Sequence, residues 1–302
     1  MFTPHGGAWA TRADEELWRG WMPRLELTGS RELTLTYMSP QIVLGNTVYT
    51  PSVTNLSNCL VTDNLVLPDG SDAGAAPAAS SLYYAYACTV GAFAGRVALS
   101  TTFPSLGDFG WALNNLGDGA LCQFVGWVGT NASPNFDDSP KSRLVVSFAH
   151  RRPKSLLALA PAYNNNNAQT TFVANSAVWA PLAANFKVDY VSNGEDAVGL
   201  ELVVVTGGAA AAEAAFGIGE NSTTAPMSAA VLANGAVSGT SVTVPGFYDP
   251  QNSLWFGAVG TLRSAHALGM TGGSALTLRA DLARNGAASD PPATMLRGWL
   301  MG

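Results

Sequence analysis

Two pairs of adjacent carboxylates are the residues best suited to chemistry, because two carboxyl groups suffice to cleave a glycosidic bond. They are Asp137–Asp138 and Glu195–Asp196. Neighbouring residues of a strand point to opposite faces of a sheet, so neither pair can flank one bond from within a strand. Turn-forming residues adjoin both pairs and favour solvated turns, and neither pair has the alternating oxygen ligands of a calcium loop. We therefore predict that the protein is not an enzyme and holds no metal.

The histidines and the known catalytic motifs give no stronger indication of an enzyme. The three histidines are scattered along the chain as His5, His150 and His266, and we expect structural or solvent-exposed roles for them. The sequence has no HExxH motif, no phosphate-binding loop and no GxSxG elbow. No cofactor is expected.

The cysteines also indicate a structural role. Cys59, Cys88 and Cys122 are an odd number and lack the CxxC spacing. This pattern argues against a disulfide framework and against a zinc site, so we predict buried free thiols. The first 20 residues contain no apolar stretch typical of a signal peptide, which predicts synthesis in a cytoplasm.

The composition excludes several classes of protein. Charged residues make up 12% of the chain, against roughly 25% in ordinary soluble domains, and the net charge is −6. Apart from residues 151–154 there is no run of basic residues, so nucleic acid is not an expected partner. No apolar run reaches the ~20 residues that span a bilayer, so no membrane insertion is expected.

Aromatic residues on β-sheet loops can bind sugars, because an aromatic face stacks on the apolar face of a sugar ring. The candidates for glycan binding are Trp111, in the glycine-rich segment 107–119, and Phe247 and Tyr248, in segment 245–249. Ordinary packing in the core or at a subunit contact remains an alternative for each of them.

The N-terminal segment resembles a short anchor. It contains three of the eight tryptophans and predicts a helix of about ten residues, which is marginal alone in water and needs a surface to lie on. The residues expected to dock are Trp9, Leu17, Trp18 and Trp21. Packing of this segment on its own domain is the alternative to docking on another subunit or another protein.

Alternation of apolar and polar residues with a period of two predicts strands along most of the chain. In the first half the predicted strands lie at 25–27, 33–37, 42–44, 47–49, 81–88, 96–101, 120–130 and 141–148. In the second half they lie at 179–190, 200–205, 241–244, 254–259 and 276–282. Segment 207–219 is ambiguous because its alanines favour a helix, but the flanking strands favour a further strand.

These strands predict an all-β protein with two antiparallel domains of the β-sandwich or jelly-roll type. The predicted divisions are an N-terminal anchor at 1–24, a proximal β domain at 25–155, a linker at 156–170 and a distal jelly-roll-like domain at 171–302.

Four motifs resemble, in the same order, a domain of tailed-bacteriophage virion proteins. In that family a "YYVYA" strand is followed by an "LxxS" strand, an "LVGxV" strand and a "V.SWxNRR" segment. The matching residues here are 82–87, 96–102, 117–128 and 136–152. Cys122-Gln123 and Ala149-His150 depart from the family pattern. In the second half, 216–223 is similar to an "xGxGxxST" strand of phage-fibre jelly rolls.

The resemblance implies a component of a virion that forms a homotrimeric fibre or spike. The N-terminal segment would bind other virion proteins at the head or tail, and the distal domain would contribute to attachment to host polysaccharide. Two alternatives stay open. One is a purely structural connector or capsid decoration protein, and the other is a polysaccharide-degrading tailspike.

Overall fold

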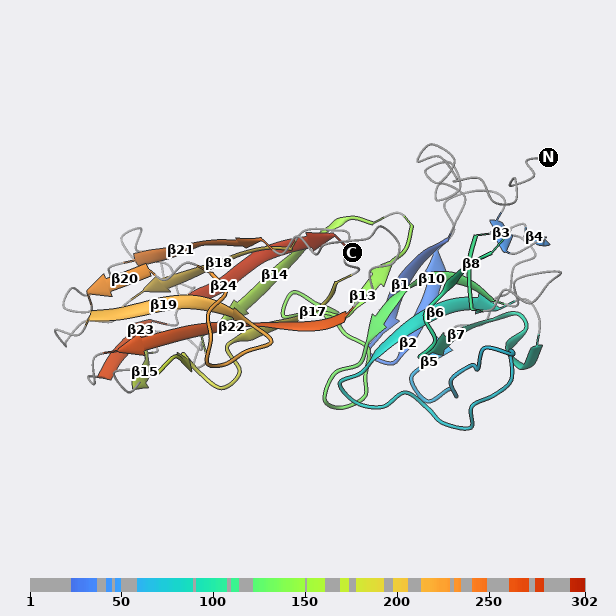
Figure 1. Ribbon diagram of the computed structural model, residues 1–302, viewed down its shortest axis with the longest axis horizontal. Coiled ribbons are helices and arrows are strands. Elements are labelled where there is room, and N and C mark those ends of the chain that lie inside the picture. Colours follow the sequence, from blue (N-terminus) through green and yellow to red (C-terminus); the bar gives the residue numbers. More distant parts are fainter. Residues whose placement is uncertain are drawn as a thin grey trace.

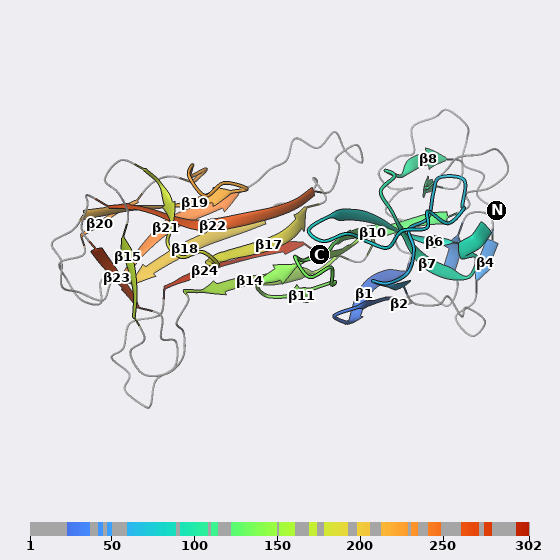
Figure 2. The same ribbon diagram turned by 90° about the horizontal axis from the view of Figure 1, so that it is seen from below.

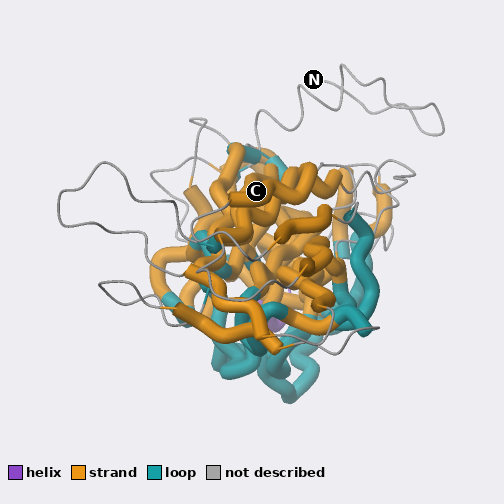
Figure 3. Tube along the Cα trace, turned by 90° about the vertical axis from the view of Figure 1, so that its left-hand side faces the viewer, coloured by secondary structure: helices purple, strands orange, loops and turns teal. Residues whose placement is uncertain are grey.

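The computed structural model describes most of the chain, and most of the described residues belong to strands. The described residues are 23–36, 42–44, 47–49, 59–88, 91–107, 110–113, 122–149, 151–160, 169–173, 178–192, 198–205, 213–228, 231–234, 241–248, 261–271, 275–279 and 294–301. Among them the only helical piece is the 3-10 turn η1 (Gly91–Phe93), and all but one strand pairing are antiparallel. The all-β prediction is therefore confirmed, as the view along the long axis also shows (Figure 3).

The first half is built from two sheets whose inner faces share one core (Figure 1). The smaller sheet has the order β1-β2-β5, from β1 (Arg24–Gly29), β2 (Glu32–Thr36) and β5 (Cys59–Leu60). The larger sheet has the order β7-β6-β10-β9-β8, with β13 also paired to β10. Its strands are β6 (Leu82–Cys88), β7 (Arg96–Ser100), β8 (Ser105–Gly107), β9 (Gly110–Ala112), β10 (Cys122–Gly129) and β13 (Val145–Ser147). A separate hairpin joins β3 (Ile42–Leu44) to β4 (Thr47–Tyr49), as predicted.

Eight strands of the second half, four from each of two sheets, pack face to face (Figures 1 and 2). One sheet has the order β14-β24-β18-β21, from β14 (Pro153–Leu159), β24 (Met295–Met301), β18 (Val198–Val205) and β21 (Ser241–Tyr248). The other contains β17-β22-β19-β20, from β17 (Lys187–Ser192), β22 (Thr261–Thr271), β19 (Glu213–Glu220) and β20 (Val231–Asn234). If these eight strands are numbered 1 to 8 in chain order, the strand orders of the two sheets are 1-8-3-6 and 2-7-4-5. These are the two Greek keys of a jelly roll, so this prediction is confirmed.

Short strands complete the second half. β16 (Ala180–Pro181) pairs with β22, and β15 (Gln169–Val173) pairs with β23 (Ala275–Arg279). The ambiguous segment is a strand from residue 213 onward, as favoured from sequence. The predicted strand at 254–259 lies outside the described residues.

The glycines of the "xGxGxxST" motif make room for the segment that follows β19. Gly217 and Gly219 lie on the same face of the strand, and residues 222–228 cover that face. A Cβ on Gly219 would lie 2.5 Å from the carbonyl oxygen of Ser222. The segment is fixed by hydrogen bonds, such as that from the Ile218 N–H to the hydroxyl of Ser228 at 2.8 Å. The motif thus describes a strand that is covered by its own following loop.

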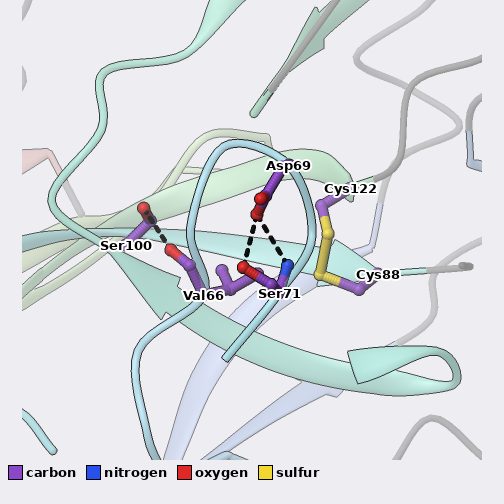
Figure 4. Close-up of a disulfide and its surroundings, with 6 residues drawn as sticks. All are labelled: Val66, Asp69, Ser71, Cys88, Ser100 and Cys122. Atoms are coloured by element: carbon purple, nitrogen blue, oxygen red, sulfur yellow. Dashed lines mark hydrogen bonds between the residues drawn. A yellow bond between two sulfur atoms is a disulfide. The ribbon is translucent and has the colours of Figure 1, made fainter. Parts of the chain in front are cut away.

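Two of the three cysteines form a disulfide, which corrects the prediction of three free thiols (Figure 4). Cys88 and Cys122 are directly opposite each other on β6 and β10, with Cα atoms 3.9 Å apart, and both are fully buried. Cys59 remains a buried free thiol, and burial raises its pKa to about 12. An odd cysteine count does not exclude one bridge, and the antiparallel register of β6 and β10 could not be read from the cysteine spacing.

A β-hairpin connects the two halves. β11 (Asp138–Ser139) and β12 (Ser142–Arg143) pair with each other, and β12 runs parallel to β17 of the jelly roll. The Leu157 N–H in β14 donates to the carbonyl of Pro140 at 2.7 Å, so the hairpin reaches both sheets. β14 takes up the first four residues of the predicted linker at 156–170 and belongs to the jelly roll.

Candidate functional site

The structure does not bring the sequence-predicted site residues together. Trp111 lies in β9 of the first half, opposite Leu106. Phe247 and Tyr248 lie at the end of β21 in the jelly roll, opposite Leu200 and Gly199. The anchor residues Trp9, Leu17, Trp18 and Trp21 lie outside the described residues.

Tyr248 shares a cross-strand row with an exposed tryptophan that the sequence analysis did not select. Gly199 pairs with Tyr248 on one side and with Trp299 on the other, and Trp299 pairs in turn with Ser155. We call Ser155, Trp299 and Gly199 the Trp299 row, because directly opposite residues of a sheet lie on the same face. The indole of Trp299 is 45% exposed. The other aromatic rings among the described side chains are buried or half-buried.

The Trp299 row lies on the outer face of the β14-β24-β18-β21 sheet. The residues that alternate with it, such as Leu200, Leu296 and Leu300, are buried in the core between the two sheets. The row is at the end of the jelly roll nearer the first half, because Ser155 accepts a 2.9 Å hydrogen bond at its carbonyl from Arg143 of the hairpin. Figure 1 shows β24 ending beside that half. The exposed ring is therefore on the flank of the molecule.

The indole of Trp299 is seated on Gly199. A Cβ on Gly199 would lie 2.7 Å from Nε1 and 3.0 Å from Cε2 of the indole, which is too close unless the indole shifts. The ring keeps this position only over a residue without a side chain. This arrangement holds the indole against the sheet and reduces the freedom that binding would otherwise have to remove.

The next row along the same face contains two opposite charges. Arg297 and Glu201 face each other across β24 and β18 and form an ion pair through Nε and Oε1. One row further, Met295 and Val203 are buried and pack with Leu157 and Leu159. The outer face therefore changes along its length from covered apolar residues to an ion pair and then to the exposed indole.

The carboxylate pair at Asp137–Asp138 serves the junction between the halves, which corrects the expectation of a solvated turn. Asp138 lies in β11 and accepts hydrogen bonds from Lys154 Nζ at 2.7 Å and from Arg143. Lys154 also donates to the carbonyl of Val145 at 3.0 Å. Burial lowers the pKa of the Lys154 ammonium, and Asp138 opposes that shift. Asp137 accepts from the Ser139 N–H, so the two carboxylates do not converge on one point.

Two further groups of titratable residues lie in the β17-β22-β19 sheet. The buried carboxylate of Glu220 accepts from the Tyr190 hydroxyl at 2.9 Å and from Arg263 at 2.7 Å. On the other face, burial lowers the pKa of His266, and Lys187 lowers it further. His5, His150 and the pair Glu195–Asp196 lie outside the described residues.

The described ranges contain no group of three His, Cys, Asp or Glu side chains that could share a metal ion. The described part of the chain also contains no helix with the length and hydropathy of a membrane span. The Trp299 row is therefore the candidate site that the described residues present most clearly. The described side chains of this row and the next offer an aromatic surface for contact and polar groups for hydrogen bonding.

Comparison with known proteins finds only remote likeness. No family model and no curated protein matches the sequence. Among solved structures, the chain is similar to a crystal structure of the infectious bursal disease virus VP2 subviral particle, with 12% identity and a TM-score of 0.29. That match covers 94% of this chain and 72% of the other. A structure of the Gx strain of the same virus gives 14% identity and a TM-score of 0.25, and the match covers 62% of this chain and half (50%) of that one. Likeness at these TM-scores carries no conclusion about function.

Proposed function

We propose that this chain is a structural protein of a virus particle. More specifically, we propose a tailed-bacteriophage virion protein that forms a homotrimeric fibre or spike on the head or tail and contributes to attachment to host polysaccharide. Its N-terminal segment would bind other virion proteins through Trp9, Leu17, Trp18 and Trp21. The proposal includes no enzymatic activity, cofactor, nucleic-acid partner or membrane insertion.

One observation carries the proposal. The motifs that resemble the phage domain are separate in sequence, yet their strands β7, β6, β10 and β13 are neighbours in one sheet. The resemblance therefore falls on one sheet, as the motifs of a single domain would. The jelly roll of the second half adds support by analogy of fold alone, since viral capsid and lectin domains use it.

Light scattering of the full chain tests the assembly. We expect three copies, and a second sample in which Trp9, Trp18 and Trp21 are replaced by Ser should keep three copies if that segment serves only for docking. Loss of the trimer in this variant would place the tryptophans within the trimer instead. A single copy for the unmodified chain at micromolar concentration would refute the fibre.

A further inference from the structure

We infer that the Trp299 row binds a neutral polysaccharide by stacking the indole of Trp299 on a pyranose ring. This inference rests on the proposed attachment function and names the ligand class and the residue. The supporting observations are the exposure of the ring, its seat on Gly199 and the polar groups around it. The planar side of a sugar suits the indole, because its C–H groups pack on an aromatic face.

The surroundings of Trp299 fit a sugar better than a protein surface. The described large hydrophobic side chains that are exposed are Leu60, Leu67, Val178, Met227 and Trp299. Of these, only Trp299 lies in the β14-β24-β18-β21 sheet, so the described side chains of β14, β24 and β18 expose one large apolar group and not a patch of the size that a stable protein interface buries. Arg297, Glu201 and Ser155 instead offer donors and acceptors beside the ring, which suits hydroxyl groups.

The charge of the protein favours a neutral polymer over an acidic one. The net charge is −6, so long-range electrostatics disfavour a polyanion relative to a neutral polymer. On the outer face, Arg297 and Glu201 neutralise each other in their ion pair. No free cation among the described residues of this face is available to attract an anionic sugar.

Native electrophoresis of the full chain in gels that contain polysaccharide tests this inference. The probes are a soluble neutral glucan, a neutral galactan and a neutral mannan, with alginate as the anionic comparison. We expect at least one neutral polymer to retard the protein and alginate not to. Trp299→Ala should weaken that binding about tenfold or more, and Trp299→Phe should restore part of it.

Two further variants separate stacking from general surface effects. In Gly199→Ala the new Cβ would displace the indole without removing it, so binding should weaken here too. Met227→Ala is the matched control, because Met227 is 60% exposed and lies away from this sheet, and its binding should be unchanged. The inference is overturned if no neutral polymer retards the protein, or if Trp299→Ala binds as tightly as the unmodified chain.

Light scattering of the same variants distinguishes this inference from the proposed fibre. If Trp299→Ala lowers the number of copies, Trp299 is a contact between subunits and the sugar site is refuted. If the unmodified chain is a monomer yet binds a neutral polymer through Trp299, the fibre fails and the sugar site stands. A trimer that binds no polymer keeps the structural proposal and overturns the inference.

Discussion

The Cys88–Cys122 disulfide should be a major source of stability for the first half. The bridge joins residues 34 positions apart, and closing a loop of that length in the unfolded chain corresponds to about 4 kcal/mol in the chain-entropy treatment. At about 2–4 °C per kcal/mol, reduction should lower the melting temperature by about 8–15 °C. Both sulfurs are buried, so reduction requires at least local opening of β6 and β10.

The assay compares oxidised and reduced protein in urea and in a thermal scan. The oxidised chain should show one thiol to Ellman's reagent in urea, that of Cys59, and three after reduction. In native buffer Cys59 should react slowly, because burial raises its pKa to about 12 and hides the sulfur from the reagent. The thiol count thus reports the bridge independently of stability.

A double variant is the control for the reductant itself. Cys88→Ala with Cys122→Ala avoids placing two hydroxyl groups in a buried site, and its melting temperature should not respond to reductant. The reasoning is refuted if an oxidised sample shows three thiols in urea. It is also refuted if oxidised and reduced chains unfold at the same temperature.

Two other predictions concern packing and pH. Gly126→Ala should lower the free energy of unfolding by about 1–3 kcal/mol, because its Cβ would overlap the carbonyl oxygen of Val146. Gly29→Ala is the control and should change the free energy of unfolding little, because a Cβ there would have no atom within 4 Å. Equal urea midpoints for the two variants would contradict this reasoning. Burial, and then Lys187, lowers the pKa of His266 below its usual 6.5, so the unfolded chain takes up the proton first. Stability should therefore fall as pH drops through about 6.5, more steeply than in His266→Gln, and parallel pH profiles would disprove the link.

Local patterns predicted much of the fold because one face of most strands is buried. In the hairpin of β1 and β2, Leu25, Leu33 and Leu35 are buried while the intervening residues are not, which is the signal that a period of two reports. In β19, buried Phe216 and Ile218 alternate with the two motif glycines, and this alternation outweighed the helix propensity of the alanines.

Features that depend on distant pairing were not predictable from the sequence. β14 pairs with β24 near the far end of the chain, so the predicted linker starts inside a jelly-roll strand. The disulfide depends on the register of β6 against β10, and the charged contacts of Asp138 depend on Lys154 in another sheet. Exposure of Trp299 likewise depends on which face of β24 the core takes, and Gly199 beneath the ring comes from another strand.

The junction between the halves has a mechanical consequence. Domains of one chain usually move relative to each other unless their interface is large and apolar. Here the β12–β17 pairing carries backbone hydrogen bonds across the junction, and one continuous core contains buried residues of both halves. Gly129 of β10 lies against Val191 and Leu262 of the jelly roll, where a Cβ would be about 3.0 Å from both side chains. Bending the molecule at this point would break sheet hydrogen bonds and open the core, so force applied to the jelly roll is transmitted to the first half.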